Sequence, residues 1–490
     1  MTVSMRAMSA GDGYRYLTGS VIVGDGPRDR SLPLVEYYAQ SGTPAGRWLG
    51  SGLSAVGLAE GAEVTEDHLA LLLGAGRHPV NGGKLGHAYP RYTTAAERVA
   101  ARLRQLPAEV ARGTADRITA EEAARPTRRA VAGFDLTFSV PKSVSAWWAL
   151  ADDATRRGIV EVHHAAVRDV LALMERDVAA ARAGAKGPHG GVLQLDVDGL
   201  MAAAFDHWDS RAGDPQLHTH VVVSNKVRTS SDGRWRALDG RPLHAALVAL
   251  SEHYNALLAD GLTGRFGVDW EQRQRGRDRT PAWEIATVPQ SLVEAFSQRS
   301  LRVDQATDRL VDAHRTQHGT TPGRDTVIRL RQQATLATRP AKQPHSLAAL
   351  TRAWSARARE VLGFDAAWLS VAPRSREQSR ASAGPMDPRA IDGCALVVLD
   401  VVSERRTTWT RWNLVAEATR QTMHLRYGST AEREEAVAAI VASAQRQSLP
   451  ITPPDLAAVP ADLQRADGSS RLRPRHATRY TSRHLSLIHI

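Results

Sequence analysis

The first clear pattern along the chain is an alternation of apolar and polar residues over residues 131–139, VAGFDLTFS. Side chains of a strand point alternately to its two faces, so Phe134, Leu136 and Phe138 would share one face. This spacing predicts a strand with one buried face. Residues 154–183 instead carry apolar residues at helical spacing and predict an amphipathic helix.

Further segments extend the pattern. VLQLDVDGLMAAAFDHW and QLHTHVVVSNKV read as strands, whereas residues 241–262 and most of 290–370 and 395–448 read as helices, with a break near 319–323. Strands that follow one another closely suit hairpins. The pattern therefore predicts an α+β protein with a largely antiparallel sheet and helices packed on one face.

Composition shifts divide the chain. A polar, basic stretch, QRQRGRDRT, follows residue 271, and a Pro-, Ser- and Arg-rich stretch lies near residues 371–389. We predict a first domain over residues 1–300, a helical extension over 301–370, a linker over 371–390, and a mostly helical segment over 391–490. No internal repeat is visible.

Charge narrows the partners. The 490 residues carry a formal net charge of +11, which favours a polyanion such as nucleic acid, although arginine is also common in proteins of GC-rich genomes. A single cysteine, Cys394, excludes a disulfide framework or a Cys-rich zinc site within one chain. There is no secretory leader pattern and no apolar run long enough to span a bilayer, so we expect a cytoplasmic protein without membrane insertion.

Three histidines cluster in FDHWDSRAGDPQLHTHVVV. On a strand, His218 and His220 share a face. Asp214-Pro215 lies in a polar turn segment, and folding the chain near residue 212 would bring His207 roughly opposite His218 or its neighbour. Facing residues lie about 5 Å apart, so the three rings could bind one divalent cation and leave positions open for a substrate oxygen. The alternative is that these are unrelated histidines of the core. Asp135 could accept from a ligand histidine or take a proton from a nucleophile.

Four tyrosines near the N-terminus, Tyr14, Tyr16, Tyr37 and Tyr38, could supply that nucleophile. A phenolate that attacks a phosphate forms a phosphotyrosine, and this bond conserves the energy of the broken phosphodiester. Ordinary half-buried tyrosines are the alternative.

Three stretches, YYAQSGTPAGRWLGSGL, GFDLTFSVPKSVS and FDHWDSRAGDPQLHTHVVVSN, resemble the TrwC/TraI-type (MobF-class) conjugative relaxases over roughly residues 1–300. The resemblance implies an HUH-type relaxase fold, with a central antiparallel sheet flanked by helices and a mostly helical C-terminal extension. It implies nicking of one DNA strand at a plasmid origin of transfer through a 5′-phosphotyrosine. The DNA would be a hairpin beside a single-stranded nick site, with accessory relaxosome proteins and a coupling protein as partners.

The resemblance also implies residue roles. His207, His218 and His220 match the metal triad, which would hold Mg²⁺ or Mn²⁺, with Zn²⁺ as an alternative. Asp135 matches the aspartate of that site. Among the tyrosines Tyr16 matches the first attacking position and Tyr14 is next, while Tyr37 or Tyr38 would serve a second strand transfer; the spacing of these tyrosines departs from the family pattern.

Two basic residues near these motifs, Lys142 and Arg211, are expected to contact DNA phosphates, or else to serve the surface or a structural ion pair. His163 and His164 are expected to face solvent, and Trp147 and Trp148 to lie in the core. An HUH-type rolling-circle replication initiator or a transposase would use the same chemistry on other DNA. A cupin-type metalloenzyme and a passive DNA-binding protein are further alternatives.

The family often carries a helicase after the relaxase. The phosphate-binding pattern GxxxxGK[ST] is absent from this sequence. Residues 467–484 resemble the approach to the helicase of longer relatives, and the final LSLIHI resembles translated sequencing adapter. We therefore expect a gene model truncated before a helicase domain, with a naturally short relaxase as the alternative.

Overall fold

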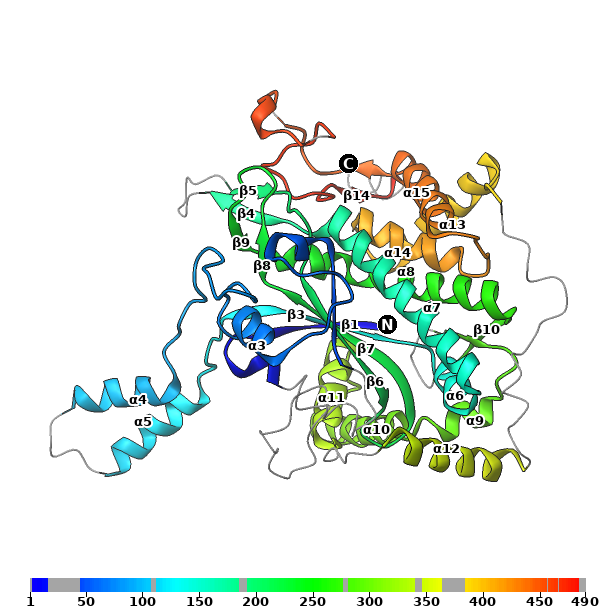
Figure 1. Ribbon diagram of the computed structural model, residues 1–490, viewed down its shortest axis with the longest axis horizontal. Helices are drawn as coiled ribbons and strands as arrows, with labels where there is room; N and C mark the ends of the chain where they lie inside the picture. The colour runs from blue at the N-terminus through cyan, green and yellow to red at the C-terminus, as the bar shows by residue number, and fades with distance from the viewer. Residues whose placement is uncertain are drawn as a thin grey trace.

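The computed structural model describes residues 2–15, 45–106, 112–184, 192–275, 281–339, 346–363, 384–455, 457–465 and 467–483. Its centre is a five-stranded sheet in which all neighbouring strands are antiparallel (Figure 1). The strand order is β1 (Val3–Ser9), β3 (Val131–Ser139), β7 (Pro215–Ser224), β6 (Ala202–Asp209) and β2 (Arg47–Leu49). The predicted α+β class is confirmed, and β3 begins and ends at the predicted residues.

Helices cover one face of this sheet and form the main core with it. They are α6 (Lys142–Leu150), α7 (Asp153–Leu173) and α8 (Gly240–Phe266). Phe138 and Val221 of the sheet belong to the same buried cluster as Trp147 and Trp148, which are 0% and 1% exposed. The expectation that this tryptophan pair packs inward is confirmed. Their burial removes a large apolar area from water, which is the main source of stability here.

The opposite face is covered by a smaller cluster that includes Trp48, Leu72, Phe205 and Val222. It is built by β2 and three short elements, η2 (Ser51–Val56), α3 (Glu66–Leu69) and η3 (Ala70–Gly74). The entry into η2 requires glycine, because Gly50 has φ +105° and an added Cβ would lie 2.2 Å from the Leu200 carbonyl oxygen. On this same face of the sheet, the residues that lie between the smaller cluster and the β6–β7 turn are polar.

Two further groups of helices flank the centre. A hairpin of α4 (Ala95–Arg104) and α5 (Arg112–Ala124) extends away from the sheet, and α9 (Gln290–Ala295), α10 (Gln298–His318), α11 (Arg324–Ala337) and α12 (Leu347–Leu362) lie beside the β6–β7 turn (Figure 1). Gly319, at φ +67°, ends α10 in the left-handed region, so the predicted helix break is confirmed.

The C-terminal helices pack back onto the first part of the chain. They are α13 (Pro388–Arg405), α14 (Arg411–Gln421) and α15 (Thr430–Gln447). Arg433 of α15 is fully buried and forms an ion pair with Asp260 of α8. Because an unpaired buried charge is strongly destabilising, this pair ties the orientation of α15 to α8.

The remaining elements are short. They are η1 (Asp12–Tyr14), η4 (Met174–Val178), β4 (Ala181–Gly184), β5 (Val192–Leu195), β8 (Lys226–Arg228), β9 (Trp235–Ala237), β10 (Trp270–Arg273), β11 (Ala282–Ile285), β12 (Trp409–Thr410), β13 (Leu449–Pro450), η7 (Ala461–Leu463) and β14 (Arg479–Thr481). Among the described helices, none combines the length and the apolar character that a bilayer crossing requires.

Candidate metal centre

Three histidine rings meet on the sheet face opposite α7 and α8. His207 of β6 lies directly across from His218 of β7, and the next pair on this face joins Phe205 to His220. The three ring centroids are 5.0, 5.1 and 5.3 Å apart, and one nitrogen of each ring lies within 4.8 Å of the others. This is the arrangement that three imidazole ligands of a single divalent ion need.

Hydrogen bonds fix which nitrogen of two rings can bind a metal. Nδ1 of His218 lies 2.8 Å from the carbonyl oxygen of Gln216, and Nδ1 of His220 lies 2.9 Å from Oδ1 of Asp135. Both acceptors lack a proton to give, so each Nδ1 donates. The neutral rings then carry their lone pair on Nε2, which is the donor atom a metal uses. The donor set therefore fits a divalent cation.

Asp135 reaches this cluster from the neighbouring strand β3. It is 4% exposed, and both carboxylate oxygens lie within 3.0 Å of Nδ1 of His220. The sequence singled out Asp135, His207, His218 and His220 separately, and the fold brings all four together. An anionic acceptor behind an imidazole raises the basicity of the ring and holds its orientation.

A buried polar chain lies on the other side of the same strands. Thr219, between the two histidines of β7, donates from Oγ1 to Oδ1 of Asp206 over 2.6 Å. Since that hydroxyl proton is engaged, Thr219 accepts from Nε2–H of His163 over 2.7 Å, and Nδ1 of His163 accepts from the hydroxyl of Tyr254 over 2.7 Å. The chain thus links α8 and α7 to both strands that carry the histidine cluster.

Asp206 is the charged end of this chain. Arg47 and His164 lie 2.7 and 3.0 Å from its Oδ2. Burial alone would raise the pKa of Asp206, but the hydrogen bonds and charges of His164 and Arg47 hold it well below its usual range. An ionised carboxylate paired in this way is tolerated inside the protein.

The expectation that the paired histidines of α7 face solvent is wrong. His163 is 0% exposed, and His164 pairs with Asp206. The two histidines bind polar residues of two strands, Thr219 of β7 and Asp206 of β6, and helical periodicity does not predict which strands pack against α7. Their one signal was the pair of polar side chains on the strand faces that point toward α7.

His163 should make the protein sensitive to mild acid. Burial, assisted by the charge of His164, lowers the pKa of His163 to about 3 from 6.5. Between these values the unfolded chain binds the extra proton, so the free energy of unfolding should rise with pH and be lost as the pH falls below about 6.5. Urea unfolding at pH 7 and pH 5 measures this.

In His163→Gln the amide preserves some of the hydrogen bonding but cannot titrate. This variant should be less stable at pH 7 by about 1–3 kcal/mol and should lose less stability than the parent between pH 7 and pH 5. His87→Gln, at an exposed position, is the control. An unchanged pH slope in His163→Gln would contradict the assignment.

The turn between β6 and β7 is held by the helical extension. Asp214 is 0% exposed and accepts from the backbone N–H of Arg299 over 3.2 Å and from Arg357 over 3.1 Å. Trp354 of α12 donates from its indole to the Gly213 carbonyl over 2.7 Å. The turn that joins the strands of His207 and His218 is therefore anchored by α10 and α12.

The two basic residues predicted to touch DNA have different surroundings. Lys142 donates to the Pro215 carbonyl over 2.8 Å, and burial lowers its pKa to about 8. Arg211 is half-buried in the turn; burial lowers its pKa, as do the charges of Arg339 and Arg299. Three like charges thus gather near the β6–β7 turn, whereas Lys142 is held within the protein.

Of the four tyrosines, the structure describes one. Tyr14 ends η1, is 5% exposed, and belongs to the smaller cluster on the histidine side of the sheet. An added Cβ on Gly74 would lie 3.3 Å from its ring, so Tyr14 is closely packed. Tyr16, Tyr37 and Tyr38 lie outside the described residues.

Comparisons with known proteins agree with this geometry. The family model described as TrwC relaxase matches residues 10–361. The multifunctional conjugation protein TraI of Escherichia coli is 30% identical over 298 residues, which cover 58% of this chain and 15% of that protein. TraI of E. coli strain K12 is 28% identical over 296 residues, again 15% of its length. The chain thus spans about 15% of the curated relatives it matches.

A solved structure is similar in fold as well. It is a conjugative relaxase TrwC in complex with oriT DNA, in a copper-bound form. The two chains are 26% identical with a TM-score of 0.50, and the match covers 74% of this chain and 99% of the other. The range of the family model ends at residue 361, before the C-terminal helices α13, α14 and α15.

Proposed function

The chain belongs to the TrwC relaxase family, and from this premise we propose that it is a conjugative relaxase that nicks one strand of DNA at an origin of transfer. The observation that carries the proposal is the group of three histidines on β6 and β7, with Asp135 behind one of them. The similar TrwC structure holds both oriT DNA and copper. A single-stranded nick site beside a DNA hairpin is the substrate we assign.

His207, His218 and His220 are the residues that would hold a divalent ion, for which we propose Mg²⁺ or Mn²⁺. When bound, such an ion polarises the scissile phosphate and stabilises charge that develops on its oxygens. Asp135 keeps the His220 ring in one orientation and one tautomer. The buried chain through Thr219 and Asp206 holds the backbone of the same strands from behind.

The covalent step is assigned to Tyr16. Its phenolic oxygen attacks the phosphorus, a tyrosine–phosphate ester forms with the 5′ end, and the bond from phosphorus to the 3′ oxygen breaks. The phenolic proton passes to a base, for which we propose Asp135, and the 3′ oxygen takes up a proton to become a hydroxyl. Attack by a 3′-hydroxyl on the ester reverses the step and rejoins the strand.

The remaining assignments are positional. Tyr37 or Tyr38 would serve a second strand transfer. Arg211, which lies near Arg299 and Arg339, would contact a DNA phosphate. Lys142, which donates a hydrogen bond to the Pro215 carbonyl, would contact a phosphate at the same end of the sheet. The location would be the cytoplasm, and accessory relaxosome proteins and a coupling protein would be partners.

Metal removal tests the proposal. A labelled single-stranded oligonucleotide that contains the transfer origin of the host plasmid is incubated with the protein and Mg²⁺ or Mn²⁺, and a denaturing gel resolves a DNA band joined to protein. The band should form with metal, vanish with excess EDTA, and return when metal is restored, because the proposed reaction needs a cation at the histidine site to polarise the scissile phosphate. An oligonucleotide from a rolling-circle replication origin is the control.

An adduct on the replication-origin strand alone would favour a replication initiator. The absence of any adduct on transfer-origin strands that span the nick would contradict the relaxase assignment.

A further inference from the structure

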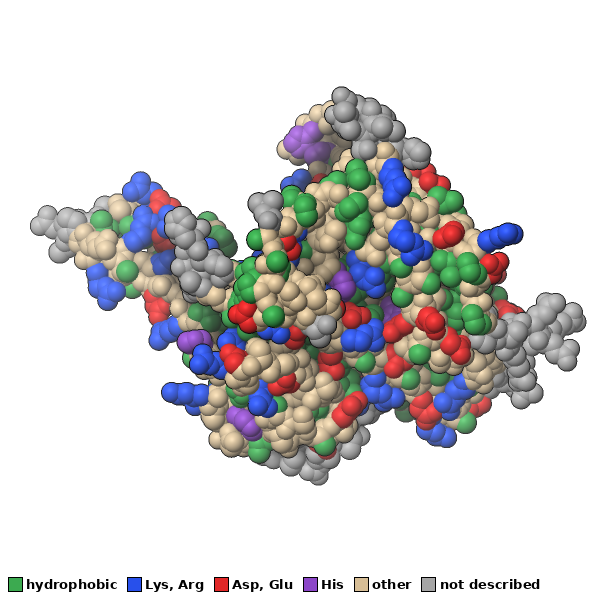
Figure 2. Space-filling view, turned by 90° about the horizontal axis from the view of Figure 1, so that it is seen from above, with side chains coloured by type: hydrophobic (Ala, Val, Ile, Leu, Met, Phe, Trp, Pro, Cys, Tyr) green, Lys and Arg blue, Asp and Glu red, His purple; other side chains and the backbone are tan. Residues whose placement is uncertain are grey.

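A solvent-open cavity lies away from the histidine cluster. Its volume is about 770 Å³, and it is bordered by the chain segment 452–480 and by the start of α14. This segment lies at the end of the molecule opposite the β6–β7 turn and α10 (Figure 1). Figure 2 looks onto this end and shows Lys and Arg side chains, interspersed with Asp and Glu, around a hollow.

One wall of the cavity contains a buried cation without a counter-ion in contact. Arg465 is 5% exposed and donates to Gln194 over 2.9 Å and to the Ser470 carbonyl over 2.6 Å. Every acceptor that it meets among the described residues is neutral, and its Nε has no acceptor there. The carboxylates of Asp196 and Asp467 favour its charge but do not bond to it, and burial still lowers the pKa of Arg465. An anion in direct contact with this guanidinium is therefore favoured.

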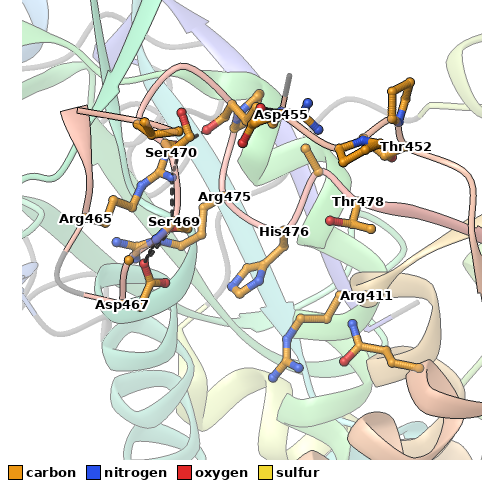
Figure 3. Close-up of a pocket in the computed structure, with 18 of the residues that line it drawn as sticks. Arg411, Thr452, Asp455, Arg465, Asp467, Ser469, Ser470, Arg475, His476 and Thr478 are labelled. Atoms are coloured by element: carbon orange, nitrogen blue, oxygen red, sulfur yellow. Dashed lines mark hydrogen bonds and ion pairs between the residues drawn. The ribbon is translucent and has the colours of Figure 1, made fainter. Parts of the chain in front are cut away.

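A second cation faces the same space. Arg411 is the first residue of α14, and in the described part of the chain no hydrogen bond or ion pair engages its guanidinium. Burial of His476 lowers the pKa of this histidine to about 4, and the nearby positive charge of Arg411 adds to the shift. Figure 3 shows both side chains in the middle of the cavity.

His476 is held in an unusual backbone conformation. It is the one described non-glycine residue with positive φ, at 58°, and its ring meets Trp412 edge-on at 5.4 Å. With its lowered pKa it is neutral at pH 7, so it offers one N–H donor without a charge. Residues in this region of φ and ψ are concentrated at binding sites.

The acidic residues on the cavity wall are engaged by their neighbours on the same wall. Asp455 pairs with Arg473 at 2.8 Å, and Asp467 accepts from the backbone and hydroxyl of Ser469 at 3.0 and 2.6 Å. The other wall cation, Arg475, pairs with Asp196 outside the wall at 2.7 Å. The wall thus carries four arginines, Arg411, Arg465, Arg473 and Arg475, against the two carboxylates of Asp455 and Asp467, so its net charge is positive.

We propose that this cavity is a phosphate-binding site, in which Arg411 contacts the phosphate directly and Arg465 supplies a buried positive charge behind it. The planar fork of an arginine suits phosphate oxygens, and the N-terminus of α14, an eleven-residue helix, favours negative charge. The volume admits a nucleotide or a short run of a DNA strand. The assignment does not depend on the nicking activity.

Binding to three probes tests the site and separates the sources of phosphate. The full chain is titrated with inorganic phosphate and dTMP by calorimetry, and with a fluorescent oligothymidylate by anisotropy. Arg411→Gln should weaken binding about tenfold or more, because a charge-assisted hydrogen bond to phosphate is lost. Arg411→Lys should retain part of the affinity. Arg405→Gln, an equal change of charge at an exposed position of α13, should match the parent.

Each outcome bears on the proposal. Loss of affinity for inorganic phosphate and dTMP supports a site for small phosphates, and loss for the oligonucleotide alone supports a strand-binding site. Equal affinity of Arg411→Gln and the parent for all three probes overturns the proposal. Adduct formation at the histidine cluster is measured in parallel, so failure of the phosphate site and failure of the relaxase assignment give different results.

Discussion

Replacement of Tyr16 by phenylalanine should abolish the covalent protein–DNA adduct. The change removes one oxygen atom, the nucleophile of the assigned covalent step, and keeps the aromatic ring. Without that oxygen no ester can form, so adduct formation should fall by at least about 10⁴-fold. A denaturing gel with a transfer-origin oligonucleotide measures the loss.

Tyr14→Phe is the matched control. Tyr14 lies two positions earlier, and its ring is closely packed against the region of Gly74. Because this ring is buried and closely packed, we expect Tyr14 to stabilise the fold, and loss of its hydroxyl should leave most of the adduct. If Tyr14→Phe abolishes the adduct and Tyr16→Phe preserves it, the two assignments must be exchanged.

His218→Ala should remove both metal binding and cleavage. The change deletes one of three nitrogen donors from a site that the fold has already assembled. We expect the affinity for Mn²⁺, measured by calorimetry, and the adduct rate each to fall by at least about 100-fold, since removing even an outer partner of a ligand costs 10- to 100-fold. Asp135→Asn removes the charge of the acceptor behind His220. It should lower Mn²⁺ affinity and the adduct rate less, in the 10- to 100-fold range.

His87→Ala, at an exposed position outside the cluster, is the control for loss of a histidine. Unfolding curves of all variants in the absence of metal separate misfolding from loss of a ligand. If His218→Ala binds Mn²⁺ as the parent does, the three histidines are not the metal site.

The sheet and the histidine group were predictable because both depend on short-range pattern. The alternation of β3 and the HxH spacing of β7 fix which side chains share a face, and one turn then determines that His207 faces His218. Long motifs also support the family, so local sequence and overall fold gave the same conclusion.

Contacts between distant segments were not predictable in the same way. His163 looked like a surface residue because its partners, Thr219 and Tyr254, come from two other elements. The helical pattern of the C-terminal segment was visible, but nothing in it indicated that Arg433 would pair with Asp260. Such pairs depend on how elements pack, and helical or strand periodicity carries no information about that choice.

The anchoring of the β6–β7 turn sets a minimum length for an active fragment. A polypeptide ending near residue 300 would retain every histidine of the cluster but would lose Trp354 and Arg357, leaving Asp214 buried without its guanidinium partner. The β6–β7 turn would then be less ordered, and the three histidines would less often hold the arrangement that binds a cation. Shortened versions of this protein should therefore extend through α12, well past the last residue to which we assign a part in the reaction.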